Sequence, residues 1–95
     1  MVSPMKTLSI TPEMLNYGRR LETIPSELEG VLWQDADRCS GAITIGDTRF
    51  PLDVLLSNLE DMDLELFFEH YPQALDLRVK IERTLEYLSD KTGPF

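Results

Sequence analysis

Three basic residues lie close together towards the C-terminal end of the chain, at Arg78, Lys80 and Arg83. Their segment has the apolar spacing of a helix, and cations on the recognition helix of a helix-turn-helix protein contact DNA phosphates and base edges. From Leu77 to Arg83 the net charge is +2, because Glu82 is the single acid among the three cations. These residues therefore predict a candidate DNA-binding helix. The alternative is a solvated helix face whose cations pair with neighbouring acids.

Acidic residues dominate the stretch before that helix. Between Phe50 and His70 there is no Lys or Arg, and the whole chain holds 9 Lys and Arg against 17 Asp and Glu, a net charge of −8. Such a surface repels phosphates and suits a basic protein partner, although a one-sign surface also serves solubility alone. The candidate partner-binding residues are Arg49, Asp53, Glu60, Asp61, Glu65 and Glu69. For Arg49 the alternative is a structural arginine that bonds the hairpin or nearby acids.

Residues of other reactive types do not form a recognisable site. His70 lies beside Glu69 and one turn after Glu65, but a zinc site needs three or four ligands and nothing nearby completes the set. Cys39 is the single cysteine and has no His close in sequence. No Gly-rich phosphate loop occurs. We therefore predict no catalytic residue, no metal, no cofactor and no enzymatic activity.

The composition is that of one small folded domain. The chain has 95 residues, of which 42% are apolar and 27% charged, so its hydrophobicity is high enough for a packed core. One cysteine cannot form an internal disulfide. No apolar run approaches the ~20 residues of a membrane span, and the N-terminal residues lack the apolar core of a signal peptide. We expect a cytoplasmic protein that does not bind a membrane.

The N-terminal half of the chain predicts one short helix and a hairpin. Thr11 followed by Pro12 predicts a helix start, and we expect the helix to end near Tyr17 because Gly18 weakens its continuation. The segment 19–30 has no consistent period. Residues 31–34 are expected to form a strand or, alternatively, the end of a helix. Strands are expected at 42–46 and 48–50, and these two form a hairpin around a turn at 46–47.

From Pro51 onward the spacing is helical. Leucines at 52, 55, 56 and 59 follow i, i+3, i+4, i+7, and the same spacing returns after Asp63, a natural N-cap. Pro72 should end the second helix. Asp76 should cap a third helix with the apolar stripe Leu77, Ile81, Leu85 and Leu88. The aromatic residues expected in the core are Trp33, Phe50, Phe67, Phe68 and Tyr71.

Together these elements predict an α+β fold, a short β-strand or hairpin element followed by a three-helix, helix-turn-helix-like bundle. Residues 1–30 are expected to form an N-terminal extension with a short helix, residues 31–90 the hairpin and trihelical domain, and residues 91–95 a C-terminal tail.

The stretch CSGAITIGDTRFPL, residues 39–52, resembles the pattern Cys-Gly-Gly-x-Pro-x-Ile-x-Gly-Thr-Arg-Ile-Pro-Val of the bacterial domain-of-unknown-function 433 family. Tyr71 and Pro72 also fall where that family has Tyr-Pro, so the resemblance spans residues 32–88. The chain departs from the pattern at Ser40, Ile43 and Asp47, which stand in place of Gly, Pro and Gly. Some members are described as VapB-type antitoxins of PIN-type nuclease toxins.

The resemblance implies an antitoxin-like or regulatory binding module that holds a protein partner, with a PIN-type toxin as the implied partner and a homodimer as the implied assembly. The alternatives are a DNA-binding transcriptional regulator that uses the third helix, and a structural protein whose helix-turn-helix likeness is only architectural.

Overall fold

The computed structural model describes residues 10–37 and 41–92. This part of the chain forms two strands, four α-helices and two 3-10 helices, so the predicted α+β class is confirmed. In chain order the elements are α1 (Pro12–Arg19), η1 (Ser26–Leu28), β1 (Leu32–Gln34), β2 (Ile43–Ile45), α2 (Leu52–Asn58), α3 (Leu64–His70), η3 (Pro72–Leu77) and α4 (Arg78–Thr92).

Helix α1 begins where the sequence predicts it. The Thr11 hydroxyl accepts a hydrogen bond from the Met14 amide at 3.2 Å, and Pro12 occupies the first turn. The helix does not end at Tyr17, however, but continues through Gly18 to Arg19. Tertiary packing explains the difference, because Gly18 is buried where α1 meets two other helices and the absence of a side chain there is required.

The hairpin pairs other strands than the sequence predicts. Strand β1 runs antiparallel to β2, with Leu32 opposite Ile45 and Trp33 opposite Thr44. The expected partner of β2, residues 48–50, forms no strand, but the Ile45 amide donates to the Phe50 carbonyl at 2.9 Å and Thr44 forms an isolated bridge with Pro51. The Thr48 hydroxyl donates to the Ile45 carbonyl at 2.6 Å and accepts from the Phe50 amide at 3.1 Å, so this segment is held as a turn.

Helices α2 and α3 agree with the predicted spacing. The leucines at 52, 55, 56 and 59 are all buried, and Asp63 caps α3 by accepting a hydrogen bond from the Leu66 amide at 2.9 Å. Helix α3 ends at His70, directly before the Tyr71-Pro72 pair, as predicted.

The predicted N-cap of the last helix at Asp76 is wrong. Residues 72–77 form the 3-10 helix η3, and α4 follows it without a break at Arg78. The Arg78 amide already donates to the Leu75 carbonyl, so no side-chain cap is needed there. Ile81, Leu85 and Leu88 of the predicted stripe are fully buried.

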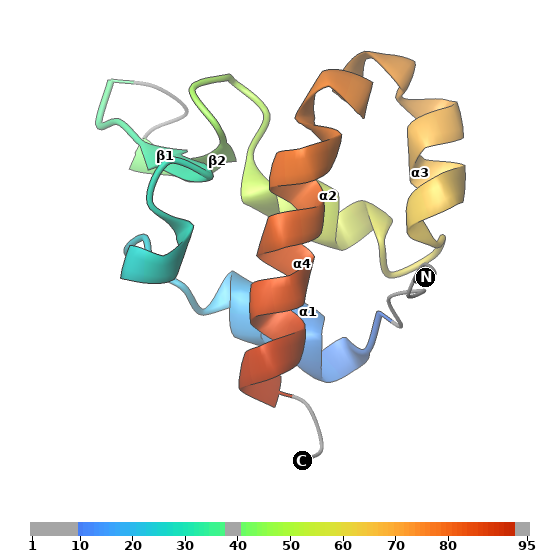
Figure 1. Cartoon of the computed structure of the whole chain (residues 1–95), viewed down its shortest axis with the longest axis horizontal. Helices are drawn as coiled ribbons and strands as arrows, with labels where there is room; N and C mark the ends of the chain where they lie inside the picture. Colours follow the sequence, from blue (N-terminus) through green and yellow to red (C-terminus); the bar gives the residue numbers. More distant parts are fainter. Residues whose placement is uncertain (1–9, 38–40, 93–95) are drawn as a thin grey trace, which may run out of the picture.

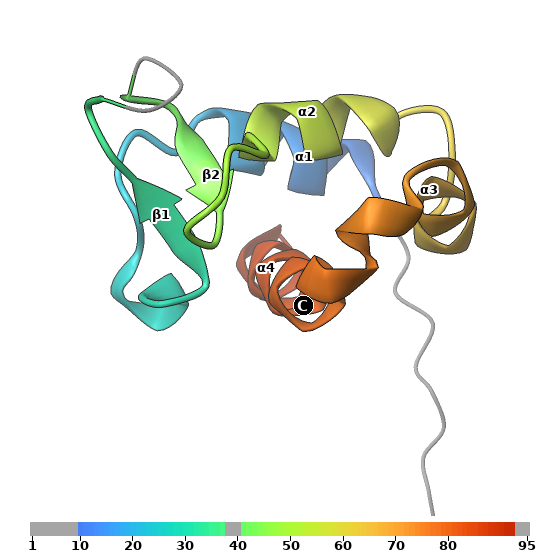
Figure 2. The ribbon, with the colours of Figure 1, turned by 90° about the horizontal axis from the view of Figure 1, so that it is seen from above.

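The helices form two layers with the hairpin at one end. Helices α1 and α2 lie side by side against α4, the β1–β2 hairpin lies at one end of this pair and α3 at the other (Figures 1 and 2). Part of the predicted N-terminal extension thus belongs to the core. The buried apolar residues include Met14, Leu15, Leu28, Leu32, Ile45, Leu55, Leu56, Phe67, Ile81, Leu85 and Leu88. In the described part of the chain, no helix has the length and apolar character needed to cross a membrane.

Candidate interaction surfaces

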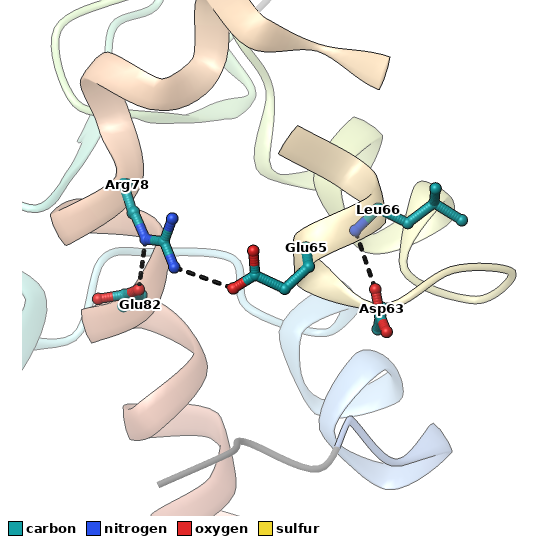
Figure 3. A network of polar contacts seen from close by, with 5 residues as sticks. All are labelled: Asp63, Glu65, Leu66, Arg78 and Glu82. Carbon is teal, nitrogen blue, oxygen red and sulfur yellow. Dashed lines mark hydrogen bonds and ion pairs between the residues drawn. The ribbon is translucent and has the colours of Figure 1, made fainter. Parts of the chain in front are cut away.

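Arg78, the first cation of the predicted DNA-binding helix, is held by two acids. Its guanidinium lies 2.9 Å from a carboxylate oxygen of Glu82 on α4 and 3.1 Å from one of Glu65 on α3 (Figure 3). It also lies 5.2 Å from the centre of the Phe68 ring. The hydrogen bonds to Glu82 and then to Glu65 raise the pKa of Arg78 above its ordinary value. Arg78 therefore links α3 to α4 rather than standing free for a phosphate.

The other two predicted DNA-binding residues, Lys80 and Arg83, do not cluster with Arg78. Two residues along an α-helix turn the side chain by about 200°, so Lys80 faces away from Arg78. The Lys80 stem lies over the turn after β2, where a Cβ built on Gly46 would lie 3.0 Å from Lys80 Cδ. Arg83 lines a shallow groove with the acids Glu86 and Asp90. The structure thus separates Arg78 from Lys80, while Lys80 and Arg83 remain neighbours three positions apart on α4, and acids outnumber cations in the groove at Arg83.

The predicted acidic surface is partly neutralised. Arg19 of α1 forms a close ion pair with Glu60 and lies 3.9 Å from Asp53. Together with Glu65, three of the predicted acids are thereby engaged. Asp61 and Glu69 are exposed and form no ion pair with a described residue, and Arg49 is exposed in the turn between β2 and α2. These residues do not form one continuous face of unpaired charge.

Trp33 is not the core aromatic that the sequence predicts. Phe67 and Phe68 are buried and Phe50 and Tyr71 pack partly against the core, but Trp33 is 41% exposed. The cause is strand alternation: Leu32 faces inward, so the next side chain must face outward. The sequence did not indicate this direction, because Val31, Leu32 and Trp33 form a continuous apolar run. An exposed tryptophan is typical of an interface rather than of a free surface.

An open cavity of about 440 Å³ lies where α1, α2 and the hairpin meet. Its apolar lining includes Leu21, Ile43, Leu52 and Leu56. Its polar lining consists of Arg19, Glu22, Gln34 and Asp53. Sequence reasoning singled out Asp53 alone among these polar residues, because the cavity combines three segments that are far apart along the chain.

The structure offers no metal centre in the part that it describes. No three His, Cys, Asp or Glu side chains among residues 10–37 and 41–92 come together as a ligand set. Cys39 lies outside the described residues.

The chain was compared with protein-family models, with curated proteins and with solved structures, and none of the three comparisons finds a match. The relation to the domain-of-unknown-function 433 family therefore stays a prediction from the residues.

Proposed function

We propose that this protein is a small non-enzymatic binding module that acts by holding a protein partner. Its contact surface is centred on Trp33, on the outward face of the β1–β2 hairpin. The single observation that carries the proposal is the 41% exposure of this tryptophan, whereas the other aromatic side chains that the structure describes are buried in the core or packed against it. Tryptophan is among the residues that contribute most to binding energy at protein interfaces.

The composition around Trp33 supports a protein partner over a nucleic acid. Residues 21–37 contain five acids and no Lys or Arg, at Glu22, Glu27, Glu29, Asp35 and Asp37. Binding to DNA or RNA depends on cations that replace the counterions of the phosphates, and within residues 21–37 the sequence offers none; the nearest are Arg19, Arg20 and Arg38 at the two ends of this stretch. A protein surface can supply both the apolar contact and the positive charge.

The antitoxin-like form of the proposal rests on the resemblance of residues 39–52 to the domain-of-unknown-function 433 pattern. In that form the partner is a PIN-type toxin and the chain acts as a homodimer. The regulatory form needs only that a protein partner is held at Trp33.

DNA binding through α4 is the alternative, and Lys80 and Arg83 are the residues that favour it. Arg78 engages Glu65 and Glu82, and α4 holds four cations, Arg78, Lys80, Arg83 and Lys91, against three acids, Glu82, Glu86 and Asp90. The excess of one positive charge is small beside the −8 of the chain.

Affinity capture with the tagged full chain tests the proposal. The wild type, Trp33→Ala and Val79→Ala are each used to capture proteins from cells that naturally produce this chain, with nuclease present. Val79 is the matched control, since it is apolar and 70% exposed and belongs to α4 rather than to the hairpin. We expect the wild type and Val79→Ala to retain the same protein and Trp33→Ala to lose it.

Two results would contradict the proposal. Equal retention by Trp33→Ala would remove the hairpin as the contact surface. A complex that disappears on nuclease treatment, together with its loss in Arg83→Glu, would favour the DNA alternative.

A further inference from the structure

The cavity between α1, α2 and the hairpin has an apolar floor and an acidic rim. Ile43, Leu52 and Leu56 are buried beneath it, whereas Glu22 and Asp53 at its edge are exposed. Its volume of about 440 Å³ falls within the ~300–1,000 Å³ that is usual for ligand sites in proteins. The cavity can therefore accept a side chain that has an apolar stem and a polar head.

The charges at the rim decide which head fits. Arg19 is the only cation that lines the cavity within the described residues, and its guanidinium is already engaged by Glu60 and lies 3.9 Å from Asp53. Glu22 forms no ion pair with a described residue, and its carbonyl accepts a hydrogen bond from Gln34 Nε2 at 3.1 Å, which fixes the chain beside the hairpin. The Asp53 carboxylate is shared with Arg19 and the Glu22 carboxylate is not, so an incoming cation would be attracted chiefly by Glu22 and an incoming anion would be repelled by it.

The strand β1 connects this cavity to the exposed tryptophan. Gln34 lines the cavity, and Trp33 is its neighbour on the opposite face of the strand. A cation over a tryptophan ring is stabilised by the ring quadrupole, more strongly than over other aromatic rings. The two places therefore lie on opposite faces of β1, and a segment with several basic residues reaches both by crossing the edge of this strand.

We propose that the cavity and Trp33 together form the docking site for a basic segment of the protein partner. One Lys or Arg of that segment places its stem on Leu52 and Leu56 and its charged head at Glu22 and Asp53. A second basic residue stacks on Trp33. This inference rests on the proposed function, to which it adds the chemistry of the partner.

Electrostatic complementarity argues for this occupant over a second copy of the chain. Two copies that meet at their hairpins would bring the acids of residues 21–37 against one another, and like charges in contact disfavour association. A basic segment instead offers the Arg and Lys charges that this region lacks.

Peptide titration of the full chain tests the inference. The probes are a short fluorescein-labelled peptide of alternating Arg and Ala with blocked ends, and the same peptide with Glu in place of Arg. Anisotropy gives the affinity, and the emission of Trp33, the single tryptophan of the chain, reports whether the peptide reaches the hairpin. We expect the Arg peptide to bind and change the Trp33 emission, and the Glu peptide to do neither.

A charge-matched pair of variants separates the site from the general negative charge. Glu22→Gln combined with Asp53→Asn removes two charges at the cavity, and Glu13→Gln combined with Asp76→Asn removes two exposed charges that do not line it. We expect the first variant to bind the Arg peptide roughly three- to tenfold more weakly, because each exposed ion pair contributes modestly. The second variant should bind nearly as the wild type does.

Equal weakening in both double variants, or no binding of the Arg peptide even at low salt, would overturn the inference. If the wild type then still captures a partner that Trp33→Ala loses, only the basic-segment inference fails and the proposed function stands. If the wild type captures no partner either, both fail.

Discussion

Gly18 shows how one small residue sets the distance between three helices. A Cβ built on Gly18 would lie 2.7 Å from one methyl group of Leu56 on α2 and 3.2 Å from one of Leu88 on α4. A glycine inside a helix costs about 0.5–1 kcal/mol relative to alanine, so its local effect opposes α1. The close packing that Gly18 permits outweighs this cost. Helix α1 therefore continues to Arg19, although helix propensity alone predicts its end near Tyr17.

Replacing Gly18 by Ala should destabilise the protein. Overpacking in a dense core typically costs 1–3 kcal/mol, and the gain in helix propensity offsets part of it, so we expect a loss of about 1–2 kcal/mol in the free energy of unfolding. Urea denaturation measures it. The matched control is Asn16→Ala, an exposed position on the same helix, which should be neutral or stabilising. If Gly18→Ala stabilises the protein as Asn16→Ala does, the helices are not in close contact at this point.

Arg78 illustrates a residue whose surroundings change its interpretation. Its i, i+4 partner Glu82 follows from sequence spacing, but Glu65 lies 13 positions away and is brought near only by the fold. The sequence therefore indicates the positive charge of Arg78 and its pairing with Glu82, but not its ion pair with Glu65. The same holds for Arg19, whose partners Asp53 and Glu60 belong to another helix and its C-terminal turn.

A double-mutant cycle on Arg78→Gln and Glu65→Gln should reveal a favourable coupling between these two side chains. The coupling should decrease as salt is added, because the pair is exposed to solvent. Unfolding curves at low and high ionic strength measure it. A coupling of zero at low salt, together with a loss of DNA affinity in Arg78→Gln, would return Arg78 to the DNA-binding role.

At the scale of elements, the predictions that succeed depend on local chemistry. Helix α3 is set by a cap at Asp63, an apolar stripe and a proline after its end, all within a few residues of one another. The predicted pairing of β2 with the segment 48–50 was wrong because the partner of a strand is not a local property, and β2 pairs with β1 instead. The predicted N-cap of α4 at Asp76 was wrong because a carbonyl of η3, that of Leu75, accepts the hydrogen bond at the start of α4.

Removing the cap of α3 should weaken the fold by a predictable amount. Asp63→Ala leaves the Leu66 amide without its acceptor and should lower the free energy of unfolding by about 1 kcal/mol. Asp63→Asn, which keeps an acceptor oxygen, should lose much less. Denaturant unfolding compares both with Asp61→Ala, an exposed acid that caps no helix. An equal effect at positions 61 and 63 would exclude a specific cap.

The contact between α1 and α4 should be visible in an alkaline titration. Burial, and then a hydrogen bond with Tyr17, raise the pKa of Tyr87 above its ordinary value. The neutral phenol is favoured in the folded state, so this contribution is fully present below pH ~10 and is lost as the pH rises through the folded-state pKa. Nearby charges are Glu27 and Lys91, whose ammonium nitrogen lies 5.4 Å from the ring centre of Tyr87.

We expect Tyr17→Phe to lower the pKa of Tyr87 towards its ordinary value, as measured by the ultraviolet absorbance of tyrosinate. Tyr71→Phe is the control, since the Tyr71 hydroxyl bonds Asn58 Oδ1 at 3.3 Å on another side of the core. A late-titrating tyrosine that persists in Tyr17→Phe would contradict the assignment to this contact.

At the scale of the whole molecule, the α+β class followed from the periodicities, but the candidate site did not. The cavity combines Arg19, Glu22, Gln34 and Asp53 from helix ends, a loop and a strand, and no spacing along the chain indicates that these residues meet. Trp33 was identified by type, yet its direction depends on which neighbour faces the core. The surface that we propose as functional is thus a product of tertiary assembly.

The most direct test of the central claim measures folding and binding on the same variant. With the captured partner purified, the affinity and the free energy of unfolding are determined for the wild type and for Trp33→Ala. Because Trp33 is 41% exposed, part of it also packs on the fold, so we expect a loss of stability clearly smaller than the loss of about 3–5 kcal/mol for a buried aromatic residue, while the affinity falls by roughly tenfold or more. An unchanged affinity, or a loss of stability as large as that of a buried aromatic residue, would contradict the account.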